Sequence, residues 1–574
     1  MDWTDIITLI NEGKWEQARQ EIDGLKGIAA WNDTAAIAEA SVCLYENDEE
    51  GAYGCIAEGL KYNCRNYELY VMLGNYYLSR NINQAYLCYE NAMFYCEEEE
   101  DGQYIRQCLK DVRNQGSMVM PVSIVIVSYN NCQMMQNCIQ FIRDNAPRSA
   151  YELVVVDNNS SDGIAEWLEQ QSDICLVRNM ENRGFGGGCN QGAKAAQPDN
   201  DVFFLNNDTL VPANAIFWLR MGLYEHEQVG AVGSVSNFVG NGQQVSEIFP
   251  SVAEYLVYGE KINVPDSNPY ERKVWLSGFG LMIKRRALDE VGLFDLRYGK
   301  GYFEDNDIGV RLRYAGYHLL LCRNSFIFHY GSQSFGKGAE AVKKIKENGL
   351  VFQEKWGFNI EDYTYPRLGI LSFIKEEKEA PIRVLEVGCG AGMKLSKIKY
   401  QWRNSVIRGI ESKEKVAQLG KDYLGVEWGN AEMMKLPYEN NYFDYIIFSN
   451  VLETFHFPEY VIGRLKPYLK DSGRILFSIY NAMHVSVVMS LLGGNFAHAG
   501  VKALDKSHIC HFAFHDIARM MGECGLIIED LQGTTEENTM RSLPEDMREA
   551  LGKLAANNTE LLQVFEYLVV AKKE

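Results

Sequence analysis

The segment Ser277-Gly278-Phe279-Gly280-Leu281-Met282-Ile283, followed downstream by Phe303-Glu304-Asp305-Asn306-Asp307 and then by His329, sets the expectation for the fold. The first part is typical of a buried strand entered through a glycine loop, and the second of an acidic turn that starts a short helix. Carboxyl groups are costly to bury without a role. Acid for proton transfer and histidine for metal binding suit a catalytic floor. The alternative is an acidic helix N-terminus, which the helix dipole favours.

Three apolar runs upstream end in polar residues, and these ends favour the catalytic interpretation. The runs are 122–127, 153–156 and 202–205, and they are followed by Ser128-Tyr129-Asn130, Asp157-Asn158-Asn159 and Asn206-Asn207-Asp208. Continuous apolar strands that alternate with helices indicate a parallel sheet covered on both faces. Ligands of such sheets bind at the carboxyl ends of the strands. One polar end is typical of a turn, but three at one edge predict a binding site.

A glycine cluster, Asn182-Arg183-Gly184-Phe185-Gly186-Gly187-Gly188, lies between the second and third runs. Bare backbone lets a ligand approach closely, and Arg183 can face a phosphate. A flexible loop has the same composition, so the cluster alone leaves both interpretations open.

The order of these motifs over residues 121–360 resembles the family 2 glycosyltransferases of the GT-A fold, particularly the rhamnosyl- and galactofuranosyl-transferase-like members. The resemblance implies an α/β nucleotide-sugar fold and inverting transfer of a sugar to a glycan or protein acceptor. It implies Asp305 as catalytic base and a divalent metal ion, Mg or Mn, on Asp208 and His329. Asn206 stands at the first position of the family's Asp-x-Asp motif, so one carboxylate remains there. The residues implied to bind the nucleotide sugar are Ser128, Asn130, Asp157, Arg183, Gly184, Asn190, Asn207, Asp208, Gly278 and Glu304.

The implied chemistry agrees with these residue types. A divalent ion neutralises the charge that develops on a diphosphate leaving group, and oxygen and imidazole ligands suit Mg or Mn. A sugar hydroxyl is a poor nucleophile until a carboxylate takes its proton. Trp275 fits either a sugar-stacking surface or the core, and the sequence leaves both open.

A second glycine motif, Glu386-Val387-Gly388-Cys389-Gly390-Ala391-Gly392, follows a strand-like run, and Glu411 ends the next run, 406–410. This arrangement holds ribose hydroxyls, and dinucleotide-binding domains share it. The acid before the first glycine and the later run 436–447 resemble the class I methyltransferases that use S-adenosylmethionine. The resemblance implies a Rossmann-like α/β fold and a cofactor site made by Glu386, Gly388, Gly390, Gly392, Glu411, Asn430 and Ala431.

Two positions depart from that family. Asn430 stands where the family commonly has Asp, and Thr454 where a histidine often follows Leu-Glu. Methyl transfer to a sugar hydroxyl needs a base, and the sequence offers four candidates without deciding among them: His456, His484, His508 and His511.

Residues 1–116 contain small and apolar residues at a fixed spacing. Ala18, Ala52 and Ala85 are separated by 34 and 33 residues, a period that indicates paired-helix repeats. The last unit resembles the tetratricopeptide repeat, which implies a concave surface for a protein partner. A plain helical packing platform is the alternative.

Bulk properties complete the expectation of a multidomain protein with a helical repeat at 1–116, a glycosyltransferase at 117–365 and a methyltransferase at 366–574. The net charge of -21 argues against a nucleic-acid partner. Fourteen cysteines without a Cys-x-x-Cys pair fit reduced thiols. No apolar run reaches the ~20 residues of a membrane span. We therefore expect a cytoplasmic protein without an integral membrane segment, any membrane contact being peripheral at the inner face.

These features together predict a bifunctional enzyme that adds a sugar to a glycan or glycoprotein, such as a surface-appendage protein, and methylates a sugar hydroxyl. The alternative is an assembly scaffold built on the helical repeat, with one catalytic domain inactive.

Overall fold

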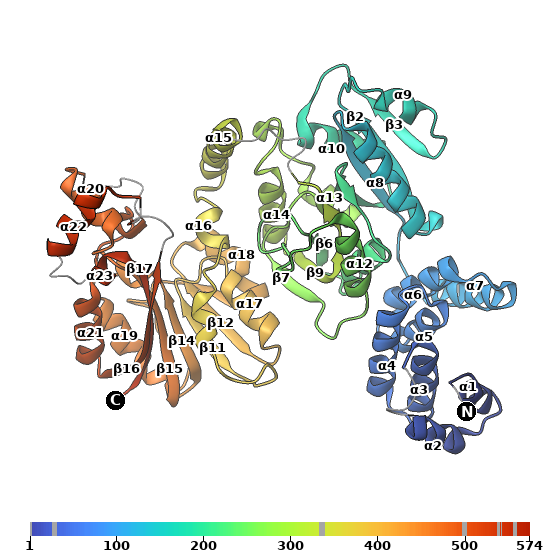
Figure 1. The fold of residues 1–574 in the computed structure, drawn as a ribbon, viewed down its shortest axis with the longest axis horizontal. Coiled ribbons are helices and arrows are strands. Elements are labelled where there is room, and N and C mark those ends of the chain that lie inside the picture. The colour runs from blue at the N-terminus through green and yellow to red at the C-terminus, as the bar shows by residue number, and fades with distance from the viewer. Residues whose placement is uncertain are drawn as a thin grey trace. The chain divides into compact units, whose positions relative to one another are not determined.

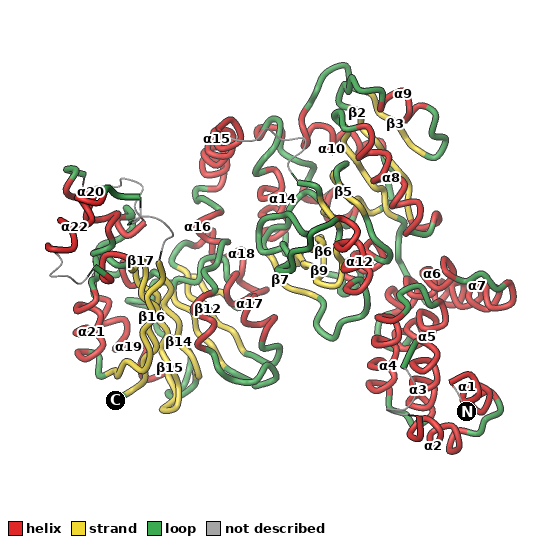
Figure 2. Tube along the Cα trace, viewed as in Figure 1, coloured by secondary structure: helices red, strands yellow, loops and turns green. Residues whose placement is uncertain are grey.

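The computed structural model describes residues 3–25, 31–331, 339–495, 502–535, 540, 542–554 and 559–574. It divides into two compact units, Met1–Gly357 and Phe358–Glu574. Figure 2 shows a region of helices only, followed by two regions that contain strands, so the predicted fold class is confirmed. Segment 358–365, which the sequence placed with the glycosyltransferase, lies in the second unit. None of the described helices combines the length and the apolar character that a membrane span requires.

Helices α1 to α7 open the described part of the first unit (Figure 1), and polar side chains cap four of them. Asn32, Asp48, Asn66 and Asn81 each accept a backbone N–H from the first turn of the helix that follows. The alanines at the repeat spacing are all buried on the second helix of a pair, at positions 18, 52 and 85. The helices are α1 (Trp3–Asn11), α2 (Trp15–Leu25), α3 (Asp33–Tyr45), α4 (Glu49–Tyr62), α5 (Tyr67–Tyr77), α6 (Ile82–Tyr95) and α7 (Glu99–Asn114).

The described part of the first unit also contains an eight-stranded mixed sheet with the order β3-β2-β1-β4-β8-β6-β9-β7. Strands β1, β2, β3 and β4 are parallel, and β8 runs antiparallel between β4 and β6. The strands are β1 (Val122–Ser128), β2 (Tyr151–Asp157), β3 (Ile174–Arg178), β4 (Asp201–Asn206), β6 (Val229–Val235), β7 (Tyr270–Lys273), β8 (Gly280–Ile283) and β9 (His318–Phe326). Two shorter strands, β5 (Thr209–Leu210) and β10 (Phe328–His329), form a separate antiparallel pair.

Alternation along the strands supplies two apolar layers, as expected for a sheet covered on both faces. On β4, Phe203 and Leu205 pack with helices α8 and α11, whereas Val202 and Phe204 pack with α10, α13 and α14. The helices of this part are α8 (Cys132–Asn145), α9 (Ile164–Glu169), α10 (Gly184–Ala195), α11 (Ala215–Leu223), α12 (Val252–Ile262), α13 (Arg285–Val291), α14 (Glu304–Tyr314) and α15 (Ala339–Trp356).

Helix α11 joins the N-terminal helices to the sheet, and every one of its residues is buried. Its N-cap Asn214 accepts hydrogen bonds from Asn91 (3.1 Å) and Tyr95 (3.0 Å) and donates to the Cys64 carbonyl (2.7 Å). Buried Arg220 pairs with buried Glu90. The N-terminal helices and the sheet therefore share one core, and the face of α6 that contacts α11 is closed to a partner.

The described part of the second unit is built around a seven-stranded sheet with the order β13-β12-β11-β14-β15-β17-β16, in which β17 is antiparallel to both neighbours. Helices α19 and α21 share an apolar cluster with the central strands, and α17 and α18 pack on β12. The strands are β11 (Arg383–Val387), β12 (Val406–Glu411), β13 (Val426–Trp428), β14 (Phe443–Ser449), β15 (Leu469–Tyr480), β16 (Leu526–Thr535) and β17 (Val564–Lys573). The helices are α16 (Glu361–Thr364), α17 (Met393–Gln401), α18 (Glu414–Leu424), α19 (Pro458–Leu465), α20 (Val485–Leu492), α21 (Phe514–Glu523), α22 (Glu545–Leu554) and α23 (Glu560–Gln563).

Glu90→Ala should destabilise the first unit strongly, because it leaves the Arg220 guanidinium buried without its carboxylate. Loss of one partner of a buried pair typically costs about 3–5 kcal/mol, measurable as a lower denaturation midpoint. Glu58→Ala, which removes an exposed pair with Lys61, is the matched control and should cost about 0–1 kcal/mol. Equal effects of the two variants would contradict the shared core.

Candidate active sites

The polar strand ends of the first sheet meet at one edge. Parallel register places Ser128 beside Asp157 and Val127 beside Asn206. Because β8 is antiparallel to β4, the loop that enters β8 reaches the same edge, where the Phe279 carbonyl accepts the Asn206 N–H at 2.9 Å. Four segments that are distant in sequence therefore converge.

Asp208 and His329 face each other across the β5–β10 pair. His329 Nε2 lies 3.2 Å from Asp208 Oδ1. His329 Nδ1 lies 2.8 Å from the Phe238 carbonyl, which can only accept, so Nδ1 carries a hydrogen. In the neutral ring, Nε2 therefore presents its lone pair toward a carboxylate oxygen and the Asn206 Nδ2 at 3.3 Å. Adjacent ligands of an octahedral ion at ~2.1 Å lie about 3.0 Å apart, so the two atoms have the spacing of neighbouring ligands. Among the described residues, no third His, Cys, Asp or Glu joins them.

Two residues that the sequence interpretation missed hold His329 in place. Asn237 accepts the His329 N–H at 2.8 Å and donates to its carbonyl at 3.0 Å, and Phe238 supplies the carbonyl for Nδ1. The Phe279 ring stacks on the imidazole, with centroids 5.2 Å apart. The available signal was that Asn237-Phe238 follows the carboxyl end of β6.

Further along the edge, the loop that follows β1 is hydrogen-bonded to the loop that follows β2. Both carboxylate oxygens of Asp157 accept the Ser160 N–H at 3.3 Å. Ser160 Oγ accepts the Asn130 N–H at 2.9 Å, and Asn130 Oδ1 accepts the Ser161 N–H at 2.9 Å. Asp157 is buried, so its carboxylate is shielded from solvent beneath this loop pair.

Three side-chain atoms near this edge are buried and lack a hydrogen-bond partner in the part of the chain that the structure describes: Ser128 Oγ, Asn207 Nδ2 and Glu304 Oε2. Buried polar atoms normally have partners, and each orphan requires an explanation. A polar ligand at the edge would supply it.

The glycine cluster forms the start of α10, and its residues have different surroundings. Gly184 has φ +74°, and a Cβ there would lie 2.6 Å from Lys300 Cα, so only glycine fits. The Asn190 amide binds both backbone groups of Phe294, at 2.8 and 2.9 Å. Arg183 is exposed.

Asp305 lies in the first turn of α14 and is fixed by backbone donors. Its Oδ2 accepts the Gly278 N–H at 3.1 Å, and its Oδ1 accepts the Asn306 N–H at 2.9 Å. Burial raises the pKa of Asp305 above its ordinary value. The chain reaches this turn through Tyr302 and Phe303, with φ values of +73° and +74°.

The neighbours of Asp305 have separate tasks. Asp307 is fully buried and is held by Arg311 Nε (2.9 Å) and Trp356 Nε1 (3.0 Å), as expected of a structural ion pair. Burial, followed by the charge of Asp305, raises the pKa of Glu304 to about 8. The raised pKa favours the protonated form of Glu304. Trp275 lies in the core, with its backbone against the Cα of Gly309.

In the second unit, the glycine motif follows β11. Gly388 and Gly390 have φ +70° and +56°, and a Cβ on Gly390 would lie 2.9 Å from the Tyr363 carbonyl. The Gly390 N–H donates to Glu411 Oε2 at 3.0 Å, which places the acid that ends β12 beside the turn. Gly392 has φ +83° and starts α17.

Glu386 carries a partner that the sequence interpretation missed. Its Oε1 lies 3.0 Å from buried Lys394 Nζ, which also contacts Ser449 Oγ at the end of β14. Glu386 Oε2 is an orphaned buried atom, and burial raises the pKa of Glu386. The spacing from Glu386 to Lys394 across the turn was the available signal.

The remaining predicted positions lie beyond β13. Asn430 is exposed, and its Oδ1 accepts the Glu432 N–H at 2.8 Å. Ala431 is buried, and its carbonyl accepts a hydrogen bond from Arg464 Nη1 at 3.2 Å.

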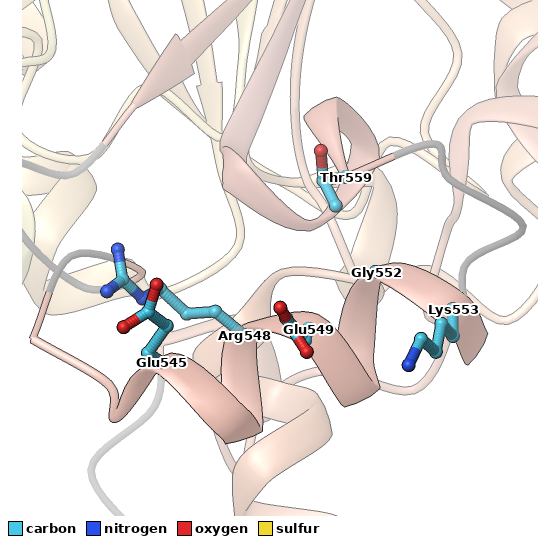
Figure 3. A pocket seen from close by; sticks show the side chains of 6 residues that line it. All are labelled: Glu545, Arg548, Glu549, Gly552, Lys553 and Thr559. Carbon is cyan, nitrogen blue, oxygen red and sulfur yellow. The ribbon is translucent and has the colours of Figure 1, made fainter.

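The open hollow in Figure 3 is a separate feature on α22, lined by side chains of both charges.

Replacement of Glu304 by Gln should change the pH dependence of stability. A carboxyl group with its pKa raised from 4.5 to about 8 contributes stability that is complete below pH ~4.5 and is lost as the pH rises through about 8. The melting temperature of Glu304→Gln minus that of the wild type should therefore increase from pH 5 to pH 9. Glu340→Gln, at an exposed site, should show a constant difference. A constant difference for Glu304→Gln as well would refute the burial argument.

Known proteins share both halves of this architecture. A family model described as Glycosyl transferase family 2 matches residues 123–291, and one described as Methyltransferase domain matches residues 361–531. The chain is 25% identical over 284 residues to the protein of Bacillus subtilis (strain 168) described as "Uncharacterized glycosyltransferase YfnE", across 41% of this chain and 71% of that one.

Two further similarities are more limited. The chain is 41% identical over 70 residues to an N-acetylglucosaminyl-diphospho-decaprenol L-rhamnosyltransferase of Mycobacterium tuberculosis (strain ATCC 25618 / H37Rv), across 12% of this chain and 22% of that one. The protein in the crystal structure of GalNAc-T7 with UDP, GalNAc and Mn2+ is 16% identical to this chain, with a TM-score of 0.34. The match covers 43% of this chain and 50% of the GalNAc-T7 chain. The chain carries a family 2 glycosyltransferase domain followed by a methyltransferase domain.

Proposed function

We propose that the first unit transfers a sugar from a nucleotide sugar to a glycan or glycoprotein, with inversion at the anomeric carbon. The observation that carries this proposal is the facing pair of Asp208 Oδ1 and His329 Nε2 at the edge where Asp157 and Asp305 also lie. Side chains suited to bind a nucleoside (Asp157), to bind a metal ion (Asp208 and His329) and to deprotonate an acceptor (Asp305) thus belong to one edge of the sheet. The rhamnosyltransferase similarity supports a donor of this class.

Asp208 and His329 would hold a divalent ion, Mg or Mn, which would neutralise charge on the leaving diphosphate. The orphaned Asn207 Nδ2 and Ser128 Oγ would donate to the donor substrate. Asn190 would act indirectly, by fixing the loop around Phe294. Arg183, being exposed, would face a phosphate.

Asp305 would take the proton of the acceptor hydroxyl. The Gly278 and Asn306 N–H groups orient its carboxylate, and its raised pKa makes it a stronger base. Glu304, whose protonated form is favoured by burial, would then add no second negative charge beside it. The acceptor oxygen then attacks opposite the leaving group, which inverts the configuration.

The second unit would bind S-adenosylmethionine and methylate a sugar hydroxyl. Glu411 would accept the ribose hydroxyls, and Glu386 Oε2, an orphaned atom, would face the methionine part. The glycines of the turn would admit the cofactor to the backbone, and Asn430 and Ala431 would flank the adenine. The described N-terminal helices would bind an acceptor or a partner protein. They would use surfaces other than the face of α6 that packs against α11.

The experiment that tests the sugar transfer is a screen of nucleotide sugars against the full chain, read by nucleotide release with and without Mn2+. Release that depends on Mn2+ supports the proposal. The alternative function, an assembly scaffold with one inactive catalytic domain, rests on Asn206 and Asn430. It predicts no release in any condition, or no binding of S-adenosylmethionine by calorimetry.

Asp305→Asn should lower sugar transfer about 10²- to 10⁴-fold, the usual contribution of a general base. Calorimetric binding of the nucleotide sugar should persist, because the carboxamide oxygen of the replacement side chain still accepts the Gly278 N–H. Transfer near the wild-type rate would remove Asp305 from the mechanism.

Glu411→Gln should weaken S-adenosylmethionine binding about 10- to 100-fold, since hydrogen bonds to a charged acceptor contribute about 1.5–3 kcal/mol. Titration calorimetry measures the change. Glu414→Gln, at an exposed position on α18, should bind as the wild type does. An unchanged affinity for Glu411→Gln would place the cofactor elsewhere.

A further inference from the structure

The structure separates the four histidines that the sequence offered as bases for methyl transfer. His484 is buried, and its Nδ1 binds Ser486 Oγ at 2.7 Å while it caps α20. His456 is exposed, 3.7 Å from Glu432. His511 is exposed. Of these three, one is engaged in a cap and two are surface groups.

His508 combines partial burial with an available nitrogen. Its Nδ1 lies 3.3 Å from the Ala503 carbonyl, which can only accept, so Nδ1 carries the hydrogen. Nε2 then holds a lone pair, and no described residue donates to it. Burial lowers the pKa of His508, while the Ala503 hydrogen bond and the charge of Asp505 oppose that effect and His511 adds to it.

The loop that carries His508 is fixed over the carboxyl ends of β14 and β15. The Ile509 and Cys510 N–H groups both donate to the Glu453 carbonyl, at 2.6 and 2.9 Å. The Ala482 N–H donates to the Phe512 carbonyl at 2.8 Å. Because β14 lies between β11 and β15, the end of β15 is two strand spacings, roughly 10 Å, from the end of β11, which enters the glycine turn.

The ring of Tyr480, the last residue of β15, lies next to the ring of His508. The two ring centroids are 5.6 Å apart. Arg367 Cζ lies 4.7 Å from the Tyr480 ring, and Arg367 pairs with Glu566 at 3.1 Å.

Segment 363–367 connects the glycine turn after β11 with the ring of Tyr480. The Tyr363 carbonyl accepts the Ala391 N–H at 3.2 Å, and Arg367 follows four residues later. Segment 363–367 therefore passes from the glycine turn to Tyr480, and the predicted methyl donor and His508 belong to one edge of the sheet.

We propose that His508 Nε2 is the base of the methyl transfer, a role that rests on the methyltransferase function proposed above. His508 takes the proton from the acceptor hydroxyl, and the electron pair of that oxygen forms the new bond to the methyl carbon of S-adenosylmethionine. The carbon–sulfur bond breaks with its electron pair left on sulfur, which yields S-adenosylhomocysteine. The imidazolium then releases its proton to solvent.

The test follows the His508 ring in the full chain by ¹³C NMR, with Cε1-labelled histidine and the resonance assigned by His508→Gln. The pKa of His508 is measured with S-adenosylmethionine and with S-adenosylhomocysteine, and no acceptor is needed. The sulfonium charge near Nε2 should lower the pKa in the first complex by about one unit relative to the second. His226 of the first unit serves as the internal reference.

Equal pKa values of His508 in the two complexes would overturn its role, while binding of both compounds would leave the cofactor site intact. If calorimetry shows that neither compound binds, the methyltransferase proposal itself fails and this inference fails with it. His508→Gln should bind S-adenosylmethionine with unchanged affinity, and a large loss would indicate a structural role. His511→Gln, at an exposed position further along the same loop, is the matched control and should leave the His508 shift in place.

Discussion

The antiparallel pairing of β5 with β10 is the constraint on which the proposed sugar-transfer site depends. Thr209 pairs with His329, and the Tyr330 N–H donates to the Asp208 carbonyl at 3.0 Å. This short pair brings a carboxylate from the turn after β4 against an imidazole that follows β9. Without it, the carboxylate and the imidazole would belong to separate loops and could not hold a cation together as proposed.

Around that pair, backbone groups do most of the positioning. A carbonyl fixes the tautomer of His329, and two N–H groups orient Asp305. Backbone donors and acceptors are held by the sheet and by α14, so they need no further ordering when a substrate arrives. In the second unit, backbone groups likewise hold the glycine turn: the Gly390 N–H donates to Glu411, and the Tyr363 carbonyl accepts the Ala391 N–H.

The sequence predicted the features that have a local signal. Apolar runs with polar ends predicted the parallel strands, and the 34- and 33-residue spacing predicted paired helices, although the identity of the repeat stays a prediction. The shared core of α6 and α11 could not be predicted, because it depends on contacts such as Arg220 with Glu90 that have no periodic signature. The support of His329 by Asn237 was hidden for the same reason. Trp275 was ambiguous until packing against Gly309 placed it in the core.

The central claim is that Asp208 and His329 share one divalent ion. Pulsed electron paramagnetic resonance of the full chain with Mn2+ and pyrophosphate, as a stand-in for the donor's diphosphate, tests it most directly. If Asp208 and His329 share one divalent ion, a histidine nitrogen couples to the bound Mn2+ and this coupling disappears in His329→Gln. Absence of the coupling in the wild type, or its persistence in His329→Gln, would show that His329 does not bind the ion.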